Sequence, residues 1–143
     1  VIFAAEDIGN ADPRALPLAT SAMNAVEMIG MPEARIILAH AVTFCATAPK
    51  SNASYVAVDE AIADVKGDRV IPVPMHLRDS HYKGAEKLGH GKGYKYPHEY
   101  EGNVVDQDYL GVEKKYYRPS DSGYELKIAE RMEAWRKQKG AGE

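Results

Sequence analysis

Apolar residues recur at helical spacing in the first part of the chain. Those on one face are three or four residues apart: Leu16, Ala19, Met23, Val26 and Ile29. This repeat is typical of an α-helix with one buried face. Asp12 and Pro13 precede the run, and these residue types favour the N-cap and the first helical turn. Because Gly30 favours a helix end, the pattern predicts a helix between Pro13 and Gly30.

Two further helices are predicted by the same kind of pattern. The second lies between Pro32 and Pro49, and its apolar face is broad: Ile36, Ile37, His40, Ala41, Phe44, Cys45 and Ala48. The third begins after Ser51, a good N-cap, and ends at Gly67. Its apolar side consists of Tyr55, Val58, Ile62 and Val65. Since very short turns join these helices, we expect all three to lie as near-antiparallel neighbours.

The apolar arcs of the second and third predicted helices are wider than one buried face needs. A helix that is apolar over a wide arc requires two partners. One partner would be the domain core and the other a second subunit, although burial at the centre of a bundle fits the pattern equally well. The candidate core or oligomer-interface residues are Ile36, Ile37, His40, Phe44, Tyr55, Val58 and Ile62.

The middle of the chain, residues 69–119, lacks sustained periodicity. It contains most of the tyrosines, several prolines and the glycines of residues 89–93. One short helix is predicted between Asp79 and Leu88. Long irregular stretches in compact domains are often functional, and a tyrosine buries its ring while its hydroxyl needs a partner. We expect this segment to be ordered against the helices or against a neighbouring subunit.

A last helix is predicted near the C-terminus. Ser120 suits its N-cap, and its apolar stripe consists of Tyr124, Ile128, Met132 and Trp135. The predicted fold is therefore an all-α helical bundle with a long irregular segment and a C-terminal helix. We expect two parts, a helical part over residues 1–68 and a second part, residues 69–143, packed on it.

Composition is that of a globular protein, with 45% hydrophobic and 27% charged residues. The formal net charge of −3 excludes a uniformly basic surface, so nucleic acid would have to meet a local patch. The one cysteine, Cys45, cannot form an intramolecular disulfide, and no apolar run reaches the roughly 18–20 residues that cross a bilayer. We expect a cytoplasmic protein without membrane contact. Because the chain opens on apolar residues without an initiator methionine, we expect a fragment of a longer protein.

Residue patterns for catalysis are sparse. The phosphate-binding pattern G-x-x-x-x-G-K-[ST] is absent, and a glycine follows Lys92 where Ser or Thr would bind Mg²⁺. Four histidines have spacings that fit no standard zinc pattern: His76, His81, His90 and His98. Asp79, Ser80 and His81 are consecutive in the sequence, but this alone does not indicate a catalytic triad. We expect no catalytic, metal or cofactor residue in this chain.

One basic stretch, residues 78–100, interleaves cations with tyrosines. Cations beside aromatic platforms are what binding of single-stranded nucleic acid requires. The alternative is that the lysines are only solvated and the tyrosines only pack. The candidate contacts for nucleic acid or a partner are Arg78, Lys83, Lys87, His90, Lys92, Tyr94, Lys95 and Tyr96.

Several longer motifs resemble one known family. The most specific is Lys87-Leu88-Gly89-His90-Gly91-Lys92-Gly93-Tyr94-Lys95-Tyr96-Pro97-His98. Residues 3–16, 32–36, 46–52, 77–79, 117–119 and 123–125 continue the similarity along essentially the whole chain. On these motifs the chain resembles the C-terminal region of the replication-associated recombination protein A (MgsA) family, whose eukaryotic relatives are the Werner helicase-interacting proteins.

This resemblance implies a larger parent protein, an AAA+ ATPase related to clamp loaders, with ATP and Mg²⁺ bound in an N-terminal module. The C-terminal region would be all-helical, similar in part to the clamp-loader collar, and would hold a homotetramer together. The parent would maintain replication forks and act in recombination, associated with the nucleoid, with DNA and single-strand-binding protein as partners. The chain is then expected to be the oligomerisation domain; the alternative is a DNA- or partner-binding module acting through residues 78–100.

Overall fold

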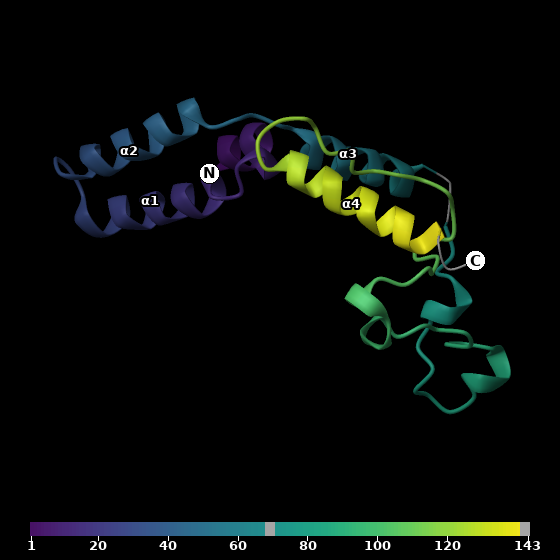
Figure 1. Cartoon of the computed structure of the whole chain (residues 1–143). Helices are drawn as coiled ribbons and strands as arrows, with labels where there is room; N and C mark the ends of the chain where they lie inside the picture. Colours follow the sequence, from purple (N-terminus) through teal and green to yellow (C-terminus); the bar gives the residue numbers. More distant parts are fainter. Residues whose placement is uncertain (68–70, 141–143) are drawn as a thin grey trace. The chain divides into compact units, whose positions relative to one another are not determined.

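The computed structural model describes residues 1–67 and 71–140, and in these two ranges it is helical (Figure 1). The α-helices are α1 (Ala15–Ile29), α2 (Ala34–Thr47), α3 (Ala53–Lys66) and α4 (Glu125–Gly140). No β-strand occurs in the described ranges, which confirms the all-α prediction. None of the helices found there is long and apolar enough to cross a membrane.

The chain divides into two compact units. The first unit consists of residues 1–63 and 116–130, and the second of residues 64–115 and 131–143. Each unit therefore contains part of α3 and part of α4. The predicted boundary between residues 68 and 69 lies outside the described residues.

The first unit begins with two short helical turns, the π-helical η1 (Ala4–Ile8) and the 3-10 turn η2 (Gly9–Ala11). The prediction that Asp12 caps α1 is wrong, because Arg14 occupies the N-cap position and no side chain in the described ranges caps this helix. Asp12 instead forms a turn directly ahead of α1: its carboxylate accepts the N–H of Arg14 at 3.1 Å, and its carbonyl accepts the N–H of Ala15 at 3.0 Å. The Arg14 guanidinium also binds the Asp12 carboxylate at 2.7 Å, which the N-cap pattern alone does not indicate.

Helices α1 and α2 form an antiparallel hairpin, which Figure 1 shows at the purple to blue end of the chain. Gly30 ends α1 at a φ of 73° and donates its N–H to the carbonyl of Val26 at 2.9 Å. The buried core of this unit is small: Ala4, Ile8 and Ala15, with Ala19, Phe44, Cys45 and Ala48 packed against it. Much of the apolar surface of the hairpin therefore stays outside the core.

The position of α3 differs from the expected three-helix arrangement, because α3 does not run alongside α2. Ala48, directly after α2, has extended backbone angles. The N–H of Ser51 then donates to the carbonyl of Asp7 at 2.8 Å, which ties the connection to the N-terminal turns. The Ser51 hydroxyl accepts the N–H of Ala53 at 3.2 Å, so the predicted cap of α3 is confirmed.

The second unit consists mainly of short turns, drawn in teal and green in Figure 1. These are η3 (Met75–Leu77), η4 (Glu86–Leu88), η5 (Pro97–Glu99) and η6 (Glu101–Asn103). The predicted helix between Asp79 and Leu88 is wrong, since only η4 forms there. Two local features are incompatible with a helix here. Gly84 has a φ of 102°, and the Asp79 carboxylate accepts a hydrogen bond from the N–H of His81 at 2.9 Å.

The prediction that Ser120 caps the last helix is also wrong, since α4 begins at Glu125. The Ser120 hydroxyl accepts the N–H of Ser122 at 3.2 Å and so forms a turn ahead of the helix. The N–H of Ser120 donates to the Glu125 carboxylate at 2.7 Å. This carboxylate is the centre of the polar cluster described next.

Candidate functional site

A buried carboxylate joins distant segments of the first unit. Glu125, the first residue of α4, is fully buried. One of its oxygens accepts the Ser51 hydroxyl and the N–H of Ser120, each at 2.7 Å, and the other accepts the Tyr117 hydroxyl at 2.9 Å. Asn10 extends the cluster, because its amide donates to Tyr117 at 3.3 Å and to the Ser54 hydroxyl at 3.0 Å.

These contacts decide the ionisation of Glu125. Burial alone would raise the pKa of its carboxyl, but the hydrogen bonds from Ser120, Ser51 and Tyr117 together lower the pKa below its ordinary value. Burial also raises the pKa of the Tyr117 hydroxyl, to which the nearby Glu125 charge contributes. Glu125 is therefore a carboxylate whose charged form is stabilised by hydrogen-bond donors.

Two glycines allow the backbone segments around this cluster to touch. A Cβ at Gly123 would overlap the carbonyl oxygen of Ala11, and Gly123 has a φ of 55°. A Cβ at Gly9 would lie 2.9 Å from the carbonyl oxygen of Ser51, at a φ of 51°. The N–H of Tyr124 donates to the carbonyl of Ala11 at 2.7 Å, which fixes this close approach.

No residue pattern predicted this cluster, although several of the family-like motifs meet in it. Residues 3–16, 46–52, 117–119 and 123–125 were noted separately as family-like motifs, and the structure brings members of all four together. No spacing rule connects Ser51 with Glu125, because they are 74 residues apart. Ser51 and Glu125 are both buried, and the Glu125 carboxylate is already bound by three donors, so we assign the cluster a structural role.

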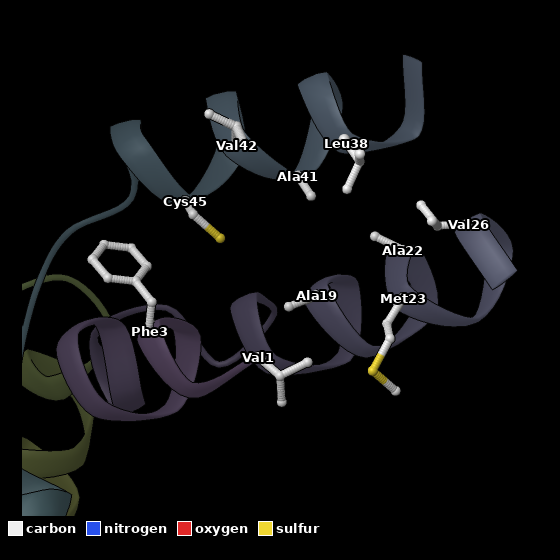
Figure 2. Close-up of a pocket in the computed structure, with 10 residues that line it drawn as sticks. All are labelled: Val1, Phe3, Ala19, Ala22, Met23, Val26, Leu38, Ala41, Val42 and Cys45. Atoms are coloured by element: carbon white, nitrogen blue, oxygen red, sulfur yellow. The ribbon is translucent and has the colours of Figure 1, made fainter. Parts of the chain in front are cut away.

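The second feature of the first unit is an apolar groove of about 470 Å³ between α1 and α2 (Figure 2). Figure 2 shows side chains from both helices facing this groove, with Phe3 at one end. Its lining is wholly apolar apart from one thiol: Val1, Phe3, Ala19, Ala22, Met23, Val26, Leu38, Ala41, Val42 and Cys45. Val42 is 64% exposed and Met23 is 54% exposed, so the groove is open to solvent.

The predicted core or interface residues are mostly at the surface. Ile36 is 63% exposed, and Tyr55, Val58 and Ile62 are between 43% and 50% exposed. His40 is exposed as well, Ile37 is half-buried, and Phe44 packs on the core. Core burial therefore accounts for Phe44 and in part for Ile37, whereas a role of the others at an interface stays a prediction.

The predicted nucleic-acid or partner contacts all lie in the second unit. Lys83, Lys87, Lys92 and Lys95 are exposed, and Arg78 and His90 are half-buried. Tyr94 is 47% and Tyr96 50% exposed, so their rings are accessible. Lys95 is held locally, since its ammonium donates to the carbonyl of Asp106 at 2.9 Å.

The glycine-rich loop of this unit, residues 89–93, is anchored on both sides. The N–H of Gly91 donates to the carbonyl of Met75 at 3.0 Å, and that of His90 donates to the carbonyl of Ala85 at 3.1 Å. A Cβ at Gly91 would lie 2.6 Å from the Ser80 Cβ, so a larger residue would push the loop away. The Nδ1 atom of His90 lies 2.8 Å from the Tyr82 hydroxyl.

No group of three or more His, Cys, Asp or Glu side chains in the described part of the chain is arranged to hold a metal ion. The histidines contact other groups instead. His81 binds Asp79 at 2.9 Å, and His76 lies 2.7 Å from the carbonyl oxygen of Asp108.

Comparison with known proteins finds relatives that match most of this chain. The replication-associated recombination protein A of Bacillus subtilis (strain 168) is 47% identical over 126 residues, which cover 86% of this chain and 30% of that protein. The protein of the same name in Escherichia coli (strain K12) is 38% identical over 138 residues, covering 93% of this chain and 30% of that protein. The ATPase WRNIP1 of Dictyostelium discoideum is 39% identical over 114 residues, which cover 77% of this chain and 13% of that protein.

The chain thus spans about a third of the length of these bacterial relatives. The family described as "MgsA AAA+ ATPase C terminal" matches residues 1–136. Both findings agree with the all-α structure and with the motifs that meet around Glu125. The chain therefore belongs to the MgsA AAA+ ATPase C-terminal family.

Proposed function

We propose that this chain is the oligomerisation domain of a replication-associated AAA+ ATPase and holds four copies together. The observation that carries this proposal is the exposed apolar surface of the α1–α2 hairpin. Glu27 and Arg35 are the only Asp, Glu, Lys or Arg residues within α1 and α2. Exposed apolar surface of this extent, with so little charge, is typical of a surface that another protein covers.

A second copy of the same chain is the partner that fits best. An isologous interface places the same patch of both subunits against each other, so an apolar hairpin with so few charges matches itself while burying little unpaired charge. The apolar side chains of α2 face two directions, since Val42 lines the groove while Ile36 does not. Two contact directions per subunit are what a ring of four copies needs. The resemblance to the MgsA family also implies a homotetramer.

The parent protein would carry the ATPase chemistry. Its ATP and Mg²⁺ would be bound outside this chain, since the relatives are about three times as long. The relatives are named replication-associated recombination protein A. The resemblance to this family implies that the parent would act on DNA at replication forks, at the nucleoid, with single-strand-binding protein as a partner. A collar-like ring formed by this domain would place four ATPase modules on the same DNA.

Sedimentation of the 143-residue chain over a dilution series tests the assembly. We expect a mass close to four times 15.7 kDa. The variant Val42→Asp should shift the chain to monomer while keeping its helical circular dichroism, because Val42 is already 64% exposed in a single copy. Asn24→Asp is the matched control, since it adds the same charge at an exposed polar position of α1 and should leave the mass unchanged.

Two results would contradict the proposal. One is a wild-type chain that is monomeric at every concentration. The other is a Val42→Asp chain that assembles as well as the wild type, since the apolar groove would then be outside any interface.

A further inference from the structure

Two clefts of the second unit share one side chain, His90. The first has a volume of about 620 Å³ and is lined by Ser80, Gly89, His90, Gly91 and Lys92. The second has a volume of about 570 Å³ and is lined by Pro72, Val73, Leu77, Arg78, Asp79, Tyr82 and His90. Because His90 lines both clefts, a group bound in one cleft would lie next to a group bound in the other. One ligand could therefore occupy both clefts.

The first cleft is suited to an anion. Its lining contains Lys92, His90 and the Ser80 hydroxyl but no carboxylate. Lys92 is exposed and forms no ion pair with any described residue, unlike Lys137, which pairs with Glu133 at 2.8 Å. The Ser80 hydroxyl likewise has no hydrogen-bond partner in the described part of the chain. A phosphate oxygen satisfies such donors, and hydrogen bonds of this charge-assisted kind are the stronger ones.

Tyr82 holds the His90 ring in place. The two rings meet edge to face at 5.8 Å, and the Tyr82 hydroxyl lies 2.8 Å from Nδ1 of His90. When this hydroxyl donates to Nδ1, the neutral ring carries its proton on Nε2. The ring then offers an N–H donor to a ligand, in a direction fixed by Tyr82.

The second cleft is suited to an uncharged, flat group. Pro72, Val73 and Leu77 provide carbon surface, and the Tyr82 ring is 45% exposed. The Asp79 carboxylate at this cleft would repel a phosphate, whereas a nucleobase has no charge. Arg78 is fixed there by a hydrogen bond from its Nε to the carbonyl of Val73 at 2.9 Å. Bases stack on aromatic rings with little regard to sequence.

We propose that these clefts bind one nucleotide of a single-stranded nucleic acid, with its phosphate at His90 and Lys92 and its base against Tyr82. The inference goes beyond oligomerisation and does not depend on it. A duplex does not fit, because its bases are stacked inside the helix and cannot reach Tyr82. Lys83 and Lys87, both exposed, extend the positive charge to neighbouring phosphates.

Fluorescence anisotropy with a labelled oligothymidylate tests the phosphate contacts. Lys92→Ala and His90→Ala should each weaken binding about tenfold. Lys92→Ala should also reduce the slope of log affinity against log salt by about 0.7, the value for one phosphate contact on a single strand. Lys115→Ala is the matched control, because Lys115 is an exposed lysine of the same unit outside both clefts. Unchanged binding by the His90 and Lys92 variants, or an equal loss in the control, overturns the proposal.

The base contact has its own test. Tyr82→Leu removes both the ring and the bond to His90, so its loss of affinity should be at least fivefold larger for oligothymidylate than for an abasic strand. Tyr82→Phe keeps the ring but loses the bond to His90, so it should weaken binding to both strands. Equal affinity of the wild type for the two strands overturns the base subsite. An acidic peptide or a duplex that competes as well as the single strand overturns the nucleotide assignment.

Sedimentation of each variant at the same concentration separates this site from assembly. All these substitutions should leave the oligomer mass of the wild-type chain unchanged, whatever that mass is. A variant that loses both nucleic-acid binding and assembly would contradict the independence of the two surfaces.

Discussion

The contacts within the first unit differ in kind from the contacts within the second. In the first unit, segments far apart in sequence meet at one buried carboxylate, Glu125, and at glycines that let backbones touch. In the second unit, short turns are joined by local hydrogen bonds, such as those from Arg78 to Val73 and from Lys95 to Asp106. Mutations at the junctions of the first unit should therefore cost far more stability than mutations at the surface of the second.

The exposed surfaces differ in the same way. The α1–α2 hairpin of the first unit exposes apolar side chains with almost no charge. The second unit exposes lysines among tyrosines. Apolar surface gains free energy when another apolar surface covers it, whereas cations gain from anions and lose that gain in salt. One chain thus exposes two surfaces of different chemistry.

The largest effect on stability is expected for Gly123→Ala. A Cβ there would overlap the carbonyl oxygen of Ala11, at a φ that L-residues rarely adopt. We expect a loss of about 3 kcal/mol in the free energy of unfolding, measured by urea denaturation. Gly93→Ala in the second unit is the control, because its Cβ meets nothing within 4 Å. It should cost about 1 kcal/mol for its positive φ alone. Equal losses in the two variants would remove the contrast between the units.

Glu125→Gln should have the next largest effect. The amide nitrogen of Gln cannot accept a hydrogen bond, so at least one donor among Ser51, Ser120 and Tyr117 loses its acceptor inside the protein. We expect a loss of about 2 kcal/mol at neutral pH, measured by urea denaturation. A neutral result would mean that the cluster joins these segments without stabilising them.

The same variant predicts a pH dependence. The pKa of the Glu125 carboxyl is lowered by its hydrogen bonds in the folded chain, so the unfolded chain binds this proton more tightly. The stabilisation by Glu125 is therefore complete above the unfolded pKa of about 4.3. It is lost as the pH falls through the lower pKa of the folded state. The difference in unfolding free energy between wild type and Glu125→Gln should shrink in this range and stay constant above it.

Periodicity and capping rules predicted those parts of the fold that depend on neighbouring residues. Helices α1, α2 and α3 are found close to their predicted bounds, and Ser51 accepts an N–H at the start of α3 as expected. The predicted cap of α1 by Asp12 is wrong, because the Asp12 carboxylate binds the N–H of Arg14 ahead of the helix. The cluster around Glu125 depends on residues far apart in the chain, so no local pattern could indicate it. The start of α4 was misplaced for the same reason, because Glu125 binds Ser120 from within the helix. For the binding surfaces, residue types indicated the chemistry, but not which cations share a cleft.

A smaller loss of stability in the first unit is expected for Asp12→Ala. The Asp12 carboxylate accepts the N–H of Arg14 directly ahead of α1 and also binds the Arg14 guanidinium, which holds the pKa of Asp12 below its ordinary value. Loss of the acceptor for this N–H should cost about 1 kcal/mol in thermal or urea unfolding. Asp12→Asn keeps an acceptor for the N–H of Arg14 and should recover most of this loss. If Asn were as harmful as Ala, the ion pair rather than the backbone hydrogen bond would be the stabilising contact.

The smallest effect is expected for Lys137→Ala, in the part of α4 that belongs to the second unit. Lys137 and Glu133 are one helical turn apart and form an exposed ion pair at 2.8 Å. Pairs of this kind contribute little to stability, because water and salt screen them. Urea denaturation at low and high salt should therefore give nearly the same free energy of unfolding for wild type and variant. A loss above about 1 kcal/mol would show that surface charges stabilise this unit, and that the contrast with the buried junction at Glu125 is smaller than the structure indicates.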